Sequence, residues 1–136
     1  MVTGGVLVER AQGSSRLANQ VVGDYNTLAA ASTKFQAAVV NCQGQKHALA
    51  CTQAAIPELI ASLNRFRRQL RASHFPPGAQ ADAPRLEAAV AGMTRAFRRM
   101  AAARTVTSFT AVALGAASAG IEVDQRTRRL VNDLRR

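Results

Sequence analysis

The feature that most constrains the fold is a stripe of apolar residues between positions 86 and 100 that recurs in alternating steps of four and three. Its members are Leu86, Val90, Met93, Phe97 and Met100. Side chains with this spacing share one face of an α-helix and interlock with neighbouring helices in bundles. The stripe predicts a helix that begins near Asp82, with Pro84 in the first turn, where a proline removes no helical hydrogen bond.

Two further helices are predicted upstream of this stripe. Apolar residues recur at helical spacing over 14–42, and Gly44 follows as a C-terminal stop. A second helix is expected over 52–74, where the hydroxyl of the first residue, Thr52, can cap free amides and Pro57 falls in the early turns. The run 75–78, Phe-Pro-Pro-Gly, ends this helix. The predicted buried face of the second helix consists of Ile56, Leu59, Ile60, Leu63, Phe66 and Leu70.

A fourth helix is predicted for the C-terminal part of the chain. The β-branched and hydroxyl residues of 105–108 favour a turn, so the helix would start at about residue 106. The alternative is a third helix that continues to about Ala117, with a short helix after Gly120. The predicted core positions of the fourth helix are Val106, Phe109, Ala113, Ala116, Gly120, Val123, Leu130 and Leu134.

The segment between Arg104 and Glu122 contains 17 uncharged residues, including two glycines. We interpret it as a buried helix whose small residues admit close neighbours. A membrane span is the alternative, but the segment holds few large apolar side chains for that role.

Composition limits the chain to one globular core. It has 136 residues, of which 48% are apolar, 19% charged and 4% aromatic, which fits neither extended disorder nor an all-β fold. The sequence therefore predicts an all-α protein: an antiparallel, up-down four-helix bundle that forms a single domain over 13–136. Residues 1–12 are expected to be a disordered or truncated N-terminal segment.

Two cysteines, Cys42 and Cys51, lie nine positions apart at the turn between the first two predicted helices. We predict a disulfide that joins the ends of these helices, which favours an oxidising, extracytoplasmic location: secreted, periplasmic or membrane-tethered. The alternative is a pair of reduced thiols in a cytoplasmic protein. The spacing does not match a zinc site.

Arginine is the residue type that stands above background, with 16 Arg against 2 Lys in a chain of net charge +10. Helical geometry points the arginines of the second and third helices outward, although the two clusters need not merge into one patch. Such arginines suit an anionic surface, lipid headgroup or wall polymer, or a partner protein. A simply solvated face is the alternative. The candidate binding residues are Arg65, Arg68, Arg71, Arg95, Arg98 and Arg99.

No catalytic constellation, metal site or cofactor motif is found in the sequence, and His47 and His74 fit a solvated loop and a helix end. We therefore expect a non-enzymatic extracytoplasmic bundle module of a bacterial envelope or secreted protein. Its partner and oligomeric state stay open. The competing hypothesis is a cytoplasmic, sequence-nonspecific nucleic-acid-binding protein. A weaker one is an apolar-ligand or haem carrier that uses Tyr25, a histidine and a methionine between the helices.

Overall fold

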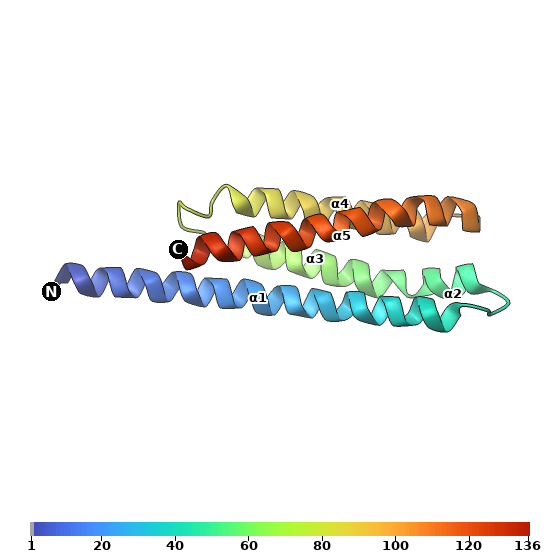
Figure 1. Ribbon diagram of the computed structural model, residues 1–136, viewed down its shortest axis with the longest axis horizontal. Coiled ribbons are helices and arrows are strands. Elements are labelled where there is room, and N and C mark those ends of the chain that lie inside the picture. Colours follow the sequence, from blue (N-terminus) through green and yellow to red (C-terminus); the bar gives the residue numbers. More distant parts are fainter. Residues whose placement is uncertain (1) are drawn as a thin grey trace.

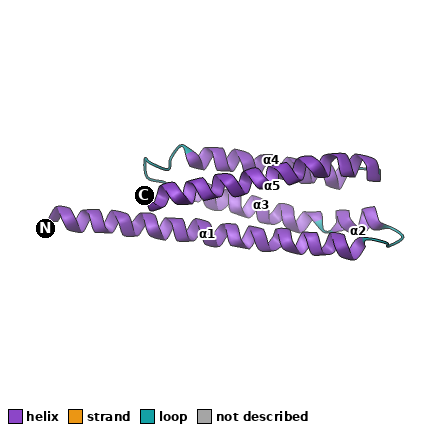
Figure 2. Cartoon of the chain, viewed as in Figure 1, coloured by secondary structure: helices purple, strands orange, loops and turns teal. Residues whose placement is uncertain are grey.

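The computed structural model describes the backbone of residues 2–136 and the side chains of residues 13–136. Helices and short connections account for this part of the chain, and it contains no strand (Figures 1 and 2). The helices are α1 (Val2–Cys42), α2 (Ala48–Ala54), α3 (Ile56–Ala72), α4 (Asp82–Ala102) and α5 (Val106–Arg135). Because α2 and α3 together form one arm, the fold is the predicted all-α, up-down four-helix bundle.

Successive arms run in opposite directions, and each arm packs against two others. α1 contacts α3 and α5, and α4 contacts the same two helices. The α3–α4 side of the bundle therefore lies opposite the α1–α5 side. The α1–α2 and α4–α5 turns share one end, which we call the disulfide end, and the α3–α4 loop lies with the C-terminus at the other (Figure 1).

The core is built mainly from the two predicted apolar stripes. All five residues of the 86–100 stripe are buried, as are the predicted residues of α3 with the exception of the half-buried Ile60. α5 contributes Val123, Leu130 and Leu134 from the predicted positions, together with Thr127 and Val131. Apart from Thr127, these side chains form one continuous apolar cluster with buried residues of α1.

The turn between α4 and α5 confirms the favoured break and excludes one continuous helix. Thr105 Oγ1 accepts a hydrogen bond from the Ser108 backbone N–H at 3.1 Å, and Ser108 Oγ accepts one from the Thr105 N–H at 3.4 Å. This reciprocal capping box satisfies two otherwise free amides. The prediction of Val106 as a core residue was wrong: its side chain is 67% exposed, because the first turn of α5 lies at the edge of the bundle.

The predicted start of the second helix at Thr52 was also wrong. α2 already begins at Ala48, so Thr52 lies inside it and is buried. The helix then breaks at Ala55, whose N–H donates to the Thr52 carbonyl at 3.1 Å. Pro57 explains the break, since it lacks an N–H and its ring clashes with the carbonyl four residues earlier.

Three smaller boundaries complete the fold. Gly44 follows the end of α1 with a φ of 78°, as expected for a glycine after a helix C-terminus. α3 ends at Ala72, two residues before the predicted end, because Ser73 is extended. Asp82 begins α4 but makes no capping hydrogen bond. α1 starts at Val2 rather than Ser14, while the predicted segment 1–12 lies outside the described side chains and stays a prediction.

Candidate functional site

The disulfide end is closed by the bond between Cys42, the last residue of α1, and Cys51 in α2. Their Cα atoms are 5.7 Å apart, within the ordinary range for a disulfide. The Cys42 side chain is almost completely buried. The pairing predicted from the sequence is therefore present, and it closes the turn that contains Gly44.

α3 and α4 carry five of the six arginines singled out in the sequence. These five side chains are exposed and have no ion-pair partner within residues 13–136. We call this set the basic face. The sixth, Arg71, is also exposed, but its Nε donates to Glu87 Oε1 at 2.7 Å. The basic face consists of Arg65, Arg68, Arg95, Arg98 and Arg99.

The Arg71–Glu87 contact shows the relative height of the two helices. Since α3 and α4 are antiparallel, the position six residues before Arg71 stands level with the position six residues after Glu87. Arg65 is therefore offset from Arg95 by two residues, or about 3 Å along the bundle axis. Arg65 and Arg68 stand level with positions 93 and 90 of α4, so the two arginine clusters follow one another along the bundle axis and do not overlap in height.

Carboxylates near the basic face already have partners. Glu58 accepts a hydrogen bond from Lys34 at 2.8 Å, and Glu87 pairs with Arg71. Arg67, which the sequence reasoning left out, is half-buried, and its Nε is buried without a hydrogen-bond partner. The α3–α4 side is consequently positive and locally uncompensated.

The opposite side of the bundle contains an open apolar groove of about 700 Å³ between α1 and α5, with α4 as its floor. We call it the α1–α5 groove. It extends from Tyr25 to Val39 along α1 and from Phe109 to Asp124 along α5, a length of about 20 Å at the helical rise per residue. Met93, Phe97 and Met100 of α4 form the floor, where the Phe97 ring meets Phe35 edge-on at 5.4 Å between centroids.

Small residues of α5 account for the groove. Ala113, Ala116, Ala117 and Gly120 face it, and a Cβ added to Gly120 would lie 3.6 Å from the Met93 side chain. α5 therefore sits close to α4, but its short side chains do not reach across to α1. The space between α1 and α5 is left unfilled.

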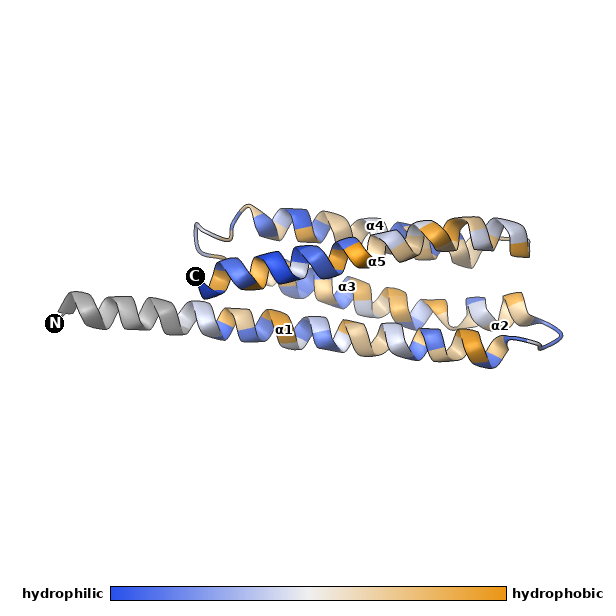
Figure 3. Cartoon of the chain, viewed as in Figure 1, coloured by the Kyte–Doolittle hydropathy of each residue, from blue (hydrophilic) through white to orange (hydrophobic). Residues whose placement is uncertain are grey.

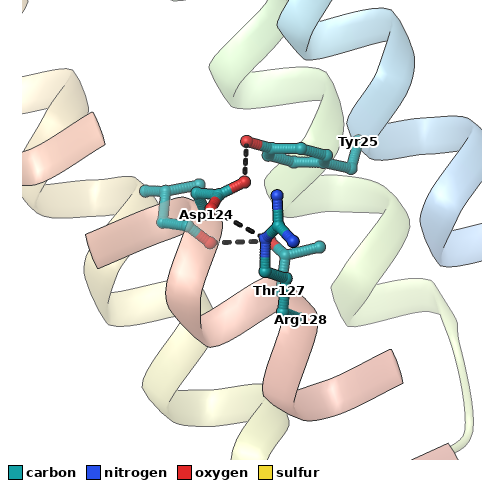
Figure 4. Close-up of polar contacts among 5 residues, drawn as sticks. Tyr25, Asp124, Thr127 and Arg128 are labelled. Atoms are coloured by element: carbon teal, nitrogen blue, oxygen red, sulfur yellow. Dashed lines mark hydrogen bonds and ion pairs between the residues drawn. The ribbon is translucent and has the colours of Figure 1, made fainter. Parts of the chain in front are cut away.

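The inner end of the groove is polar. The Tyr25 hydroxyl donates to Asp124 Oδ1 at 2.9 Å, and Arg128 Nε donates to Asp124 Oδ2 at 2.9 Å (Figure 4). Burial, and then the hydrogen bond and charge of Asp124, raise the pKa of Tyr25 to about 12. Tyr25 therefore stays a neutral hydrogen-bond donor at physiological pH.

Beside the groove, α5 exposes large apolar side chains. Leu114 is 71% and Ile121 60% exposed, and Ala116 alone is buried within 105–121. The prediction of a buried helix here was wrong, because α5 meets its neighbours along one face while apolar residues occur on all sides. Figure 3 shows this apolar half of α5 and its hydrophilic C-terminal half. By length and composition, α5 is apolar enough to cross a membrane, and little of that stretch is buried.

The groove contains two of the three residue types considered for haem. Tyr25, Met93 and Met100 line it, whereas no histidine does among the described residues. His47 and His74 are exposed near opposite ends of the bundle. No group of three or more metal-ligating side chains occurs within the described part of the chain.

A carboxyl pair lies at the C-terminal end. The pKa of Asp82 is raised above its ordinary value by a hydrogen bond with Asp133, by burial and by the Asp133 charge, against the opposing charges of Arg129 and Arg85. The Arg129 Nε is 3.7 Å from Asp82 Oδ1.

Because the folded state binds this proton more tightly than the unfolded state, the pair stabilises the bundle at low pH and loses that contribution as the pH rises through the raised pKa. We therefore compare the free energy of unfolding of the wild type with that of Asp82→Asn. The wild-type value minus the variant value should increase as the pH falls from about 7 to about 4. Urea titrations at several pH values measure this difference. Glu122→Gln, at an exposed carboxylate, should show no such trend, and parallel pH curves for wild type and Asp82→Asn would contradict the assignment.

Compared with protein-family models, with curated proteins and with solved structures, the chain matches none of them. The class defined by fold and site is a single-disulfide four-helix bundle with a basic face on one side and an apolar groove on the other.

Proposed function

We propose that this protein is a non-enzymatic, extracytoplasmic helical-bundle module of a bacterial envelope or secreted protein that binds an anionic surface through the basic face. The observation that carries the proposal is the set of five exposed arginines on one helix pair, without carboxylate partners within residues 13–136. The ligand chemistry is phosphate or carboxylate groups displayed on a lipid headgroup layer or a wall polymer.

The chemistry of arginine supports this proposal. A guanidinium group presents planar donors that match phosphate and carboxylate oxygens, and it stays charged at all physiological pH values. Because the five arginines have no ion-pair partner within residues 13–136, they do not stabilise the fold by pairing. A net charge of +10 also draws polyanions toward the protein at low salt.

The disulfide supports the extracytoplasmic part of the proposal. Disulfides such as Cys42–Cys51 persist in oxidising compartments and are rare in the cytoplasm. The same basic face would also attract duplex DNA, so nucleic acid is the competing ligand. The extracytoplasmic location inferred from the disulfide disfavours nucleic acid as the ligand.

Two variants with equal charge test the basic face. Each replaces three exposed cations without an ion pair in the described part by glutamine, and thus lowers the net charge from +10 to 10 − 3 = +7. Binding is measured to phosphatidylglycerol vesicles, to soluble polyphosphate and to a DNA duplex over a range of salt. The basic-face variant is R65Q/R95Q/R98Q, and the matched control is R16Q/K46Q/R104Q.

We expect the basic-face variant to bind vesicles or polyphosphate about tenfold or more weakly, and to show a shallower dependence on salt, by about one log unit per log of salt for each lost contact. The control should change affinity much less. Equal losses of affinity in the two variants would show that binding depends only on net charge, and would contradict a specific site on the basic face. Binding to duplex alone would support the nucleic-acid alternative, and no binding to any polyanion at about 50 mM salt would overturn the proposal.

A further inference from the structure

The α1–α5 groove has the form of a second binding site, separate from the basic face. It lies on the opposite side of the bundle, and its volume of about 700 Å³ falls within the range of small-molecule sites. Apolar and aromatic side chains dominate its lining. The hydrogen-bonded Tyr25–Asp124 pair lies at one end, and the other polar lining residues, Ser32, Thr33 and Gln36, belong to the α1 wall. A long apolar body with one polar end therefore fits its chemistry.

The shape of the groove narrows the ligand further. It is about 20 Å long, which is the length of an extended long-chain acyl group, and it lies between α1 and α5, which are antiparallel (Figure 1). Its floor of Met93, Phe97 and Met100 offers flexible and aromatic surface that adapts to a methylene chain.

The polar end selects the charge of the head group. Asp124 already accepts hydrogen bonds from both Tyr25 and Arg128, so a cationic head would have to displace the guanidinium. Arg128 uses its Nε for Asp124, and its Nη groups make no hydrogen bond to any residue of the described part. Those donors favour an anionic head.

We propose that the α1–α5 groove binds a single-chain anionic amphiphile, with the acyl chain along the Met93–Phe97 floor and the head group at Arg128. This site is independent of the basic face, so the two proposals fail separately. The R65Q/R95Q/R98Q variant should bind the amphiphile with unchanged affinity.

The first test is chain length, measured by titration calorimetry with octanoate, dodecanoate and palmitate below their aggregation concentrations. Each fully buried methylene raises affinity about fourfold, and each half-buried one about twofold. We therefore expect affinity to rise steadily from octanoate to palmitate. A flat series would overturn the proposal.

The second test blocks the groove from either wall. Ala117 of α5 and Thr33 of α1 line the groove but are exposed, so Ala117→Trp and Thr33→Trp fill it without disturbing the core. Each should weaken palmitate binding about tenfold or more, by displacing buried methylenes. The control is Ala111→Trp, at an exposed position on α5 outside the groove, which should stay within about twofold.

The third test concerns the head group. Arg128→Gln should weaken palmitate and leave hexadecanol unchanged, whereas hexadecylamine should bind the wild type more weakly than palmitate. Equal affinity for palmitate and hexadecylamine would overturn the role of Arg128.

Tryptophan variants that change the oligomeric state but not palmitate affinity would identify the groove as an interface between copies and refute the ligand site.

Discussion

Phe66→Ala is expected to lower the free energy of unfolding by about 3–5 kcal/mol, because it opens a cavity at the centre of the bundle. The Phe66 side chain is 1% exposed, and its ring lies 6.1 Å from that of Tyr25 between centroids. Loss of Phe66 therefore removes core packing and loosens the support of the Tyr25 ring at the groove. Urea unfolding followed by circular dichroism measures the loss.

Phe109→Ala is the matched control. Phe109 is half-buried and lines the open groove, so one side of its ring already lacks protein contacts. Its removal should cost about 1 kcal/mol, since less apolar surface returns to water. Equal losses for the two variants would contradict the division between a filled core and an open groove.

The parts of the fold that the sequence predicted depend on local chemistry. The stripe from Leu86 to Met100 is buried because its spacing leaves one apolar face on an otherwise polar helix. The Thr105–Ser108 capping box and the positive φ of Gly44 likewise arise within a few residues. Such local signals predict structure correctly because they depend only on residues close to one another in the sequence.

The second arm shows where local signals compete. Thr52 has the side chain of a good helix cap, yet it lies buried inside α2. Pro57 imposes a break two residues earlier, at Ala55, and the segment before this break is already helical within the disulfide-closed turn. The sequence contains both the Thr52 cap signal and the Pro57 break signal. It does not show which of them decides the helix boundary, because Thr52 is buried at the disulfide end.

The groove could not be predicted, because it depends on how three helices meet. The residues from Val106 to Ile121 are apolar enough for a core, and the pattern predicted burial. Their small side chains instead bring α5 close to α4 and leave space toward α1. Likewise, the outward direction of the arginines followed from helical geometry, but the relative height of the two clusters depends on the register of α3 against α4, which the Arg71–Glu87 contact indicates.

Loss of the disulfide is expected to lower the free energy of unfolding by about 2–3 kcal/mol, from the entropy that an open loop of about ten residues regains in the unfolded chain. Cys42→Ala/Cys51→Ala tests this under oxidising conditions. Wild-type protein treated with reductant should approach the stability of the double variant. The double variant itself should not respond to reductant, which serves as the internal control.

The same bond decides between the proposed location and its alternative. Alkylation of native cells at the moment of lysis, followed by intact mass, should find neither Cys42 nor Cys51 blocked if the protein resides in an oxidising compartment. Two blocked thiols would contradict the extracytoplasmic proposal and make duplex DNA the first ligand to test on the basic face. The ligand proposal for the α1–α5 groove does not depend on that outcome, because none of the lining residues lies within the disulfide-closed turn 42–51.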